Sequence, residues 1–62
     1  MIRVGKEEFL AFISRHPLAI PDGFKLVGAY QQTKWIENGL EVARQSLDGF
    51  GTIYEVDFLP TP

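Results

Sequence analysis

The stretch that decides the fold of this chain is WIENGLEVAR, residues 35–44. Asn38-Gly39 stands in its middle, and this dipeptide favours the tight two-residue turn of a β-hairpin because both residues tolerate a positive φ. A second turn signal, Asp48-Gly49, follows after further alternation of apolar and polar residues. The second half of the chain is therefore predicted to form a three-stranded antiparallel meander.

The two turns also predict how the strands pair. A two-residue turn at residues 38–39 gives the pairs Glu37 with Leu40, Ile36 with Glu41 and Trp35 with Val42. A three-residue loop at residues 48–50 gives the pairs Leu47 with Gly51, Arg44 with Tyr54, and Val42 with Val56. Because side chains alternate between the two faces of a strand, both turns yield the same division. The predicted buried face holds Trp35, Leu40, Val42, Tyr54, Val56 and Phe58, and the predicted open face holds Lys34, Ile36, Glu41, Ala43, Gln45, Ile53, Glu55 and Asp57.

A helix is predicted over roughly residues 6–15. Gly5 is an acceptable N-cap, and two glutamates in the first turn face the positive end of the helix dipole. The apolar side chains fall on one side at three- and four-residue spacing, and Pro17 ends the helix by disfavouring helical geometry in the residue before it. We expect this helix to cover the apolar face of the sheet. The aromatic side chains of the core would then be Phe9, Phe12, Trp35 and Phe58.

The segment between helix and sheet is predicted to be a connector. Residues 20–23, Ile-Pro-Asp-Gly, carry proline and glycine where a type I turn prefers them. Leu18 and Ile20 are expected to tuck under this turn. The first strand is then long and broken, about residues 24–37, with a bulge or bend between Gly28 and Thr33.

The fold class that follows is α+β, an N-terminal helix packed on one face of a three-stranded antiparallel β-meander, in one small domain spanning residues 1–62. An alternative α-β-α-β order places a second helix at about residues 34–47. Four apolar residues of that segment do fall at helical spacing. Against this alternative, Asn38-Gly39 would lie inside the helix at a cost of about 1 kcal/mol.

Composition limits the chemistry that the chain can carry. The 62 residues include no cysteine and one histidine, which excludes disulfides and disfavours a zinc site. That histidine, His16, is interpreted as a helix-end residue whose ring covers apolar surface. The sequence contains no phosphate-binding or cofactor motif, so we expect no catalytic residue, no metal and no cofactor. No apolar run approaches the length of a membrane span and no signal-peptide pattern occurs, so a cytoplasmic location is expected.

Charge is distributed unevenly along the chain. Residues 1–34 hold five basic and three acidic residues, a balance of +2, whereas residues 35–62 hold one basic and five acidic residues, a balance of −4. The predicted sheet is therefore acidic. Because binding to phosphates requires lysine and arginine, nucleic acid is a less favoured partner for the sheet than a protein with a basic surface.

These features predict a non-catalytic protein-binding module, a regulator or inhibitor that acts through an acidic sheet face. Glu41, Glu55 and Asp57 would supply charge complementarity. Ile36 and Ile53, with Ala43 between them on the predicted face, would supply an apolar centre. Phages and other mobile elements encode many small acidic proteins, and such an origin fits the size and charge of this chain.

Two other functions are consistent with the sequence. One is a small nucleic-acid-binding module that uses the basic N-terminal half. Its contact residues would be Arg3, Lys6, Arg15, Lys25 and Lys34. The other is a structural homodimer formed through edge strands, which small chains use to complete their burial.

Overall fold

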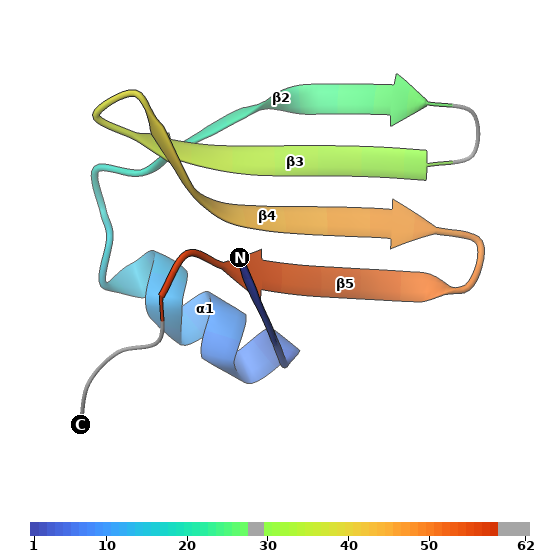
Figure 1. The fold of residues 1–62 in the computed structure, drawn as a ribbon, viewed down its shortest axis with the longest axis horizontal. Coiled ribbons are helices and arrows are strands. Elements are labelled where there is room, and N and C mark those ends of the chain that lie inside the picture. The colour runs from blue at the N-terminus through green and yellow to red at the C-terminus, as the bar shows by residue number, and fades with distance from the viewer. Residues whose placement is uncertain (28–29, 59–62) are drawn as a thin grey trace.

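The computed structural model describes residues 1–27 and 30–58, with the side chains of residues 23–27 left out. These described residues form one helix and five strands (Figure 1). In chain order these are β1 (Ile2–Val4), α1 (Lys6–Ser14), β2 (Ile20–Val27), β3 (Tyr30–Glu37), β4 (Leu40–Asp48) and β5 (Gly51–Val56). The strands form one sheet in the order β1-β5-β4-β3-β2, and every neighbouring pair is antiparallel. No helix of the described residues is long and apolar enough to cross a membrane.

The α+β class, the N-terminal helix and the Asn38-Gly39 hairpin are confirmed. Asn38 and Gly39 have φ values of 52° and 78°, the pair of positive angles that a type I′ hairpin turn requires. Residues of the segment 34–47 belong to β3 and β4 on either side of this turn, so the alternative with a second helix is wrong.

The sheet has five strands, so the prediction of a three-stranded meander is wrong in strand number. β1 was missed because it has only three residues and gains its hydrogen bonds from β5, far away in sequence. The single broken strand predicted over residues 24–37 is two antiparallel strands, β2 and β3. Residues 28 and 29 of the predicted bend lie outside the described residues.

The predicted type I turn at residues 20–23 is also wrong, because these residues begin β2. Proline is tolerated there since β2 is an edge strand, where a missing N–H need not break the ladder. A register shift between Asp22 and Phe24 marks a bulge at this point. Residues 20–23, although typical of a turn, thus form the irregular start of an edge strand.

The register differs from the prediction by one residue beyond the first hairpin. The pairs Glu37–Leu40 and Ile36–Glu41 are confirmed, but Trp35 pairs with Ala43 because Val42 is an extra residue in a bulge of β4. The second turn has two residues, so the observed pairs are Asp48 with Gly51, Gln45 with Tyr54, Arg44 with Glu55, and Ala43 with Val56. Ala43, predicted to be open, is therefore fully buried, and Gln45 shares the face of Tyr54. Leu40 and Phe58, predicted to be buried, are exposed.

The core lies between α1 and the sheet. Its fully buried side chains include Phe9, Phe12 and Val56. Phe9 contacts Trp35 edge to face with ring centroids 5.2 Å apart, and Phe12 contacts Phe58 in the same manner at 5.2 Å. The predicted contacts among these aromatic rings are therefore present, but Phe58 makes its contact from a half-exposed position. Each such pair is worth about 0.5–1.5 kcal/mol beyond its buried area.

Candidate functional site

The face of the sheet opposite α1 carries no other element of the described residues, and we call it the open face (Figure 1). The strand register places one charged residue from each strand in a single row across it. We call this the charged row. From the β2 edge to the β1 edge it consists of Asp22, Lys34, Arg44, Glu55 and Arg3.

Ion pairs organise the middle of this face. Arg44 Nη2 lies 2.5 Å from Glu41 Oε1, and Arg44 Nη1 lies 3.9 Å from Glu55 Oε1. Lys34 Nζ lies 3.5 Å from the other carboxylate oxygen of Glu41. The side chains of Glu41 and Glu55 are partly buried, and each carboxylate forms an ion pair with at least one basic residue of the same sheet.

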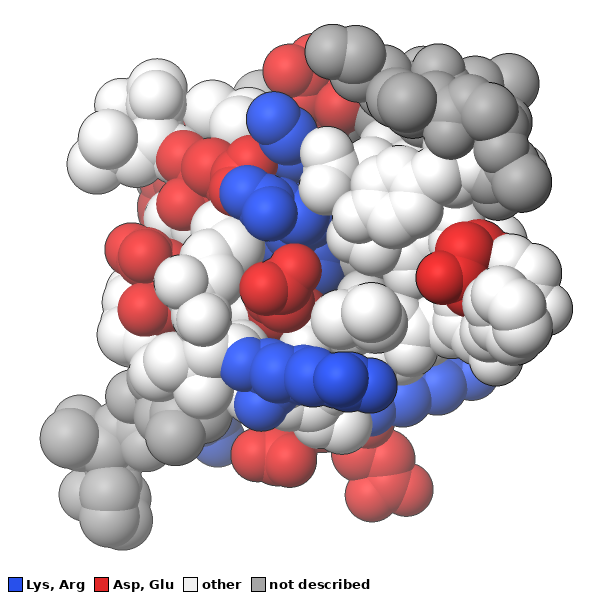
Figure 2. Space-filling view, turned by 45° about the vertical axis from the view of Figure 1, so that its right-hand side comes forward, with Lys and Arg blue, Asp and Glu red and all other residues white. Residues whose placement is uncertain are grey.

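The open face is consequently balanced in charge. The predicted acidity came from counting the C-terminal half alone, whereas β1 and β3 bring Arg3 and Lys34 from the N-terminal half onto the same face. In the view of Figure 2, basic and acidic side chains lie next to one another. A count of charges along the sequence could not show that residues from the two halves of the chain lie side by side in the sheet.

The structure brings together some of the five predicted contact residues and separates others. Glu41 and Glu55 meet around Arg44, and Ile36 pairs with Glu41. Ile53 pairs with Ser46, on the far side of the charged row from Ile36.

Ala43, predicted to lie between Ile36 and Ile53, is in the core instead. Asp57 follows the end of β5, where it is exposed and its backbone N–H donates to the Val42 carbonyl at 2.8 Å. The predicted apolar centre on the open face is therefore absent.

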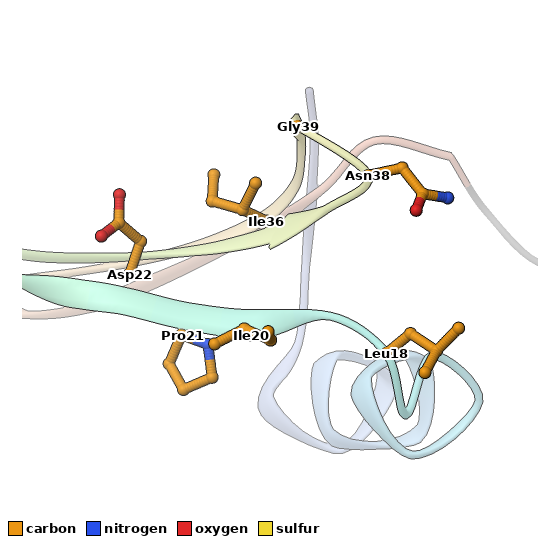
Figure 3. Close-up of a pocket in the computed structure, with 7 residues that line it drawn as sticks. All are labelled: Leu18, Ile20, Pro21, Asp22, Ile36, Asn38 and Gly39. Carbon is orange, nitrogen blue, oxygen red and sulfur yellow. The ribbon is translucent and has the colours of Figure 1, made fainter.

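A groove of about 540 Å³ lies at the corner where the β2 edge meets the β3–β4 turn (Figure 3). Its lining residues are Leu18, Ile20, Pro21, Asp22, Ile36, Asn38 and Gly39. Leu18 is 71% exposed and Ile20 is 68% exposed, so the prediction that both tuck under a turn is wrong. We call this the corner groove.

Pairing between β2 and β3 forms the apolar part of the corner groove. Ile20 pairs with Ile36, which places an apolar pair at the end of the open face next to Glu41. Asp22 and Ile36 point to the same side of the sheet in Figure 3. The sequence signal for the groove was Ile20 itself, which pairs with Ile36 once residues 20–27 are assigned to a strand.

His16 has a partner that the sequence did not reveal. Its Nδ1 lies 3.2 Å from Glu37 Oε2, with both side chains about one-fifth exposed. The imidazole stacks on Phe12 with ring centroids 4.3 Å apart, so the predicted covering of apolar surface is confirmed. Ser14, the nearest hydroxyl in sequence, donates to the Ala11 carbonyl. The pair joins the end of α1 to the end of β3.

The second hairpin presents an aromatic side chain at its tip. Phe50 is fully exposed. Asp48 Oδ1 accepts hydrogen bonds from the backbone N–H groups of Phe50 at 2.7 Å and Gly51 at 3.1 Å, which orders the turn. This tip is at the opposite end of the sheet from the corner groove (Figure 1).

The basic residues of the N-terminal half are not gathered in one place. Arg3 and Lys34 belong to the charged row, where Glu55 separates Arg3 from Lys34 and Arg44. Lys6 begins α1 and Arg15 follows its last residue, so they lie at opposite ends of the helix. The side chain of Lys25 lies outside the described residues. A stripe of positive charge that could follow a nucleic-acid backbone is therefore not formed by the described side chains.

Comparison with protein-family models, with curated proteins and with solved structures found no match to this chain.

Proposed function

We propose that this chain is a non-catalytic protein-binding module that uses the corner groove as its contact site. The observation that supports this proposal is the exposed apolar cluster of Leu18 and Ile20 beside Ile36. Apolar surface that is rimmed by polar residues is typical of protein contacts.

The chemistry of the partner follows from the lining of the groove. An apolar side chain of the partner would fill the space between Ile20 and Ile36. Asp22 is exposed at the rim and would attract a basic group on the partner. Glu41 is already held by Arg44 and Lys34, so it would select the orientation of a partner rather than supply most of the attraction.

The residues proposed for binding differ from those that the sequence suggested. Ile36 and Glu41 stay in the proposed site because they lie beside the groove. Glu55 contributes through the Arg44 network. Ile53 and Asp57 are left out because the fold places them away from the corner groove.

The test compares binding of a purified partner to wild type and to L18S/I20S. The partner is first isolated by affinity capture on the immobilised wild-type chain, and its affinity for each variant is then measured by titration. Both substituted side chains are more than two-thirds exposed, so the fold should be kept. Burial of one apolar side chain is worth about 1.5–3 kcal/mol, so the affinity should fall at least about tenfold.

The matched control is F50S, which removes a fully exposed apolar side chain from the other end of the sheet. It should bind the partner as wild type does. Equal affinity of L18S/I20S and wild type, with unchanged far-UV circular dichroism, would rule out the corner groove as the contact site.

A further inference from the structure

The charged row has an order of charges that is complementary to itself. Read from β2 to β1, its signs are negative, positive, positive, negative and positive, with Arg44 of the central strand β4 in the middle. If a second copy of the row is placed against the first in the opposite direction, each residue except the middle one faces a residue of opposite charge. This property arises only after the five strands are in register.

A two-fold axis parallel to β4 produces this reversal between two molecules placed open face to open face. β3 of one molecule then lies over β5 of the other, and β2 lies over β1. Lys34 meets Glu55 of the second copy, and Asp22 meets Arg3 of the second copy. The two-fold axis repeats both contacts, so four contacts join opposite charges.

Two contacts between like charges lie on the axis, at Arg44 in the middle of the charged row and at Glu41 of the same strand. Arg44 of one molecule faces Arg44 of the other, but each is already paired with its own Glu41 and Glu55. A two-fold axis along the charged row would instead place each residue over itself, with like charges at every position. The charges therefore favour one of these two orientations.

We propose that the open face is an interface with a second copy of this chain, in a two-fold dimer held by the charged row. The proposal does not rest on the proposed function, because self-association is measured without any partner. We choose a second copy of the chain as the partner because the charges of the charged row are complementary to those of a reversed copy across the whole sheet face.

The edges of the sheet are poorly suited to the edge-strand homodimer that the sequence allowed. β1 offers only three residues. On β2, Pro21 lacks a backbone N–H and the bulge between Asp22 and Phe24 interrupts the regular spacing of hydrogen-bonding groups. Proline and bulges on edge strands oppose the addition of further strands.

The expected dimer is weak and sensitive to salt. Five strands of three to nine residues, about 4.8 Å apart, present at most about 600 Å² per molecule, less than the roughly 800 Å² per partner of a standard interface. Exposed ion pairs contribute little each and are screened by salt. We expect dissociation constants in the high micromolar range at 20 mM NaCl and at least about tenfold weaker association at 500 mM.

The test is analytical ultracentrifugation of the purified chain from about 10 µM to 1 mM at both salt concentrations. Wild type should show a monomer–dimer equilibrium at low salt. R3E and D22R should each abolish the dimer. Each substitution gives residues 3 and 22 the same charge, and the two-fold axis repeats this unfavourable contact. The double variant R3E/D22R should restore the dimer, because the swap recreates both pairs.

Restoration by the double variant identifies a contact between molecules. Arg3 and Asp22 are on the two edge strands with three strands between them, so they lie about 19 Å apart and cannot pair within one chain. K6E, on α1 and away from the open face, is the control and should dimerise as wild type does.

Three results would overturn the proposal. The first is a monomer at all concentrations of wild type at low salt. The second is an open-ended series of oligomers, which indicates pairing of β1 with β2 of the next molecule. The third is a double variant that stays monomeric while its far-UV circular dichroism and thermal midpoint match wild type.

Discussion

His16 Nδ1 lies 3.2 Å from Glu37 Oε2 in the folded chain, so a residue just after α1 is joined to the last residue of β3. The pair spans 21 positions in sequence. Since α1 covers the sheet from one side only, this contact helps to fix the end of the helix over the β3–β4 hairpin, next to the corner groove.

Glu37→Ala should therefore reduce the free energy of unfolding by about 1 kcal/mol, because it leaves a partly buried imidazole without its partner. Urea denaturation monitored by tryptophan fluorescence measures the change. Asp57→Ala removes an exposed carboxylate and should change stability by less than about 0.5 kcal/mol. Equal effects of the two substitutions would show that the His16–Glu37 contact contributes nothing to stability.

Ala43→Leu tests the β3–β4 register. Ala43 is fully buried opposite Trp35 and Val56, and overpacking of a filled core costs about 1–3 kcal/mol. Ala11→Leu, at an exposed position on α1, should be nearly neutral or slightly stabilising. If Ala43→Leu is as well tolerated as Ala11→Leu in a thermal unfolding experiment, Ala43 is on the open face and the register without a bulge is correct.

Gly39→Ala tests the first hairpin turn. Gly39 has a φ of +78°, which a residue with a Cβ adopts only with strain, so the substitution should cost about 1 kcal/mol. Gly49→Ala is the matched control, because Gly49 lies in the second turn without a positive φ and has open space around it. A chain in which both substitutions have the same effect does not contain the type I′ turn described for residues 38 and 39.

Arg44→Ala should destabilise the chain although Arg44 is on the open face. Its guanidinium joins Glu41 and Glu55, so truncation leaves two partly buried carboxylates close together and removes packing by the side-chain stem. We expect a loss of about 1–2 kcal/mol at low salt, measured by urea denaturation. Arg15→Ala, just after α1, is the control and should have a smaller effect. A loss for Arg44→Ala no larger than for Arg15→Ala would show that the network is not stabilising.

The sequence predicted the elements whose signals are local. Asn38-Gly39 determined the hairpin because the required φ values belong to those two residues. The helix was predicted because the spacing of its apolar residues, including Phe9 and Phe12, lies within a few turns.

Features that depend on distant pairing could not be predicted. β1 is three residues long and is a strand only because β5 lies beside it. Pro21 is a turn residue by preference, but the edge of a sheet accepts it. The bulge at Val42 changes the face of Ala43, and nothing in the alternation of residues marks it.

The candidate site was predicted only in part for the same reason. Glu41 and Glu55 were assigned to one face together with Lys34, and Arg44 joins them there because the bulge at Val42 shifts the register by one residue. The corner groove depends on the pairing of Ile20 with Ile36, which follows only when residues 20–27 are placed in β2.

The pairing of β2 with β3 supports both the corner groove and the charged row, and nuclear Overhauser effects in the wild-type chain test it most directly. The expected result is a set of cross-strand contacts between Ile20 and Ile36 and between Asp22 and Lys34. Absence of these contacts in a spectrum that does show Trp35 beside Ala43 would mean that the groove and the five-residue row do not exist.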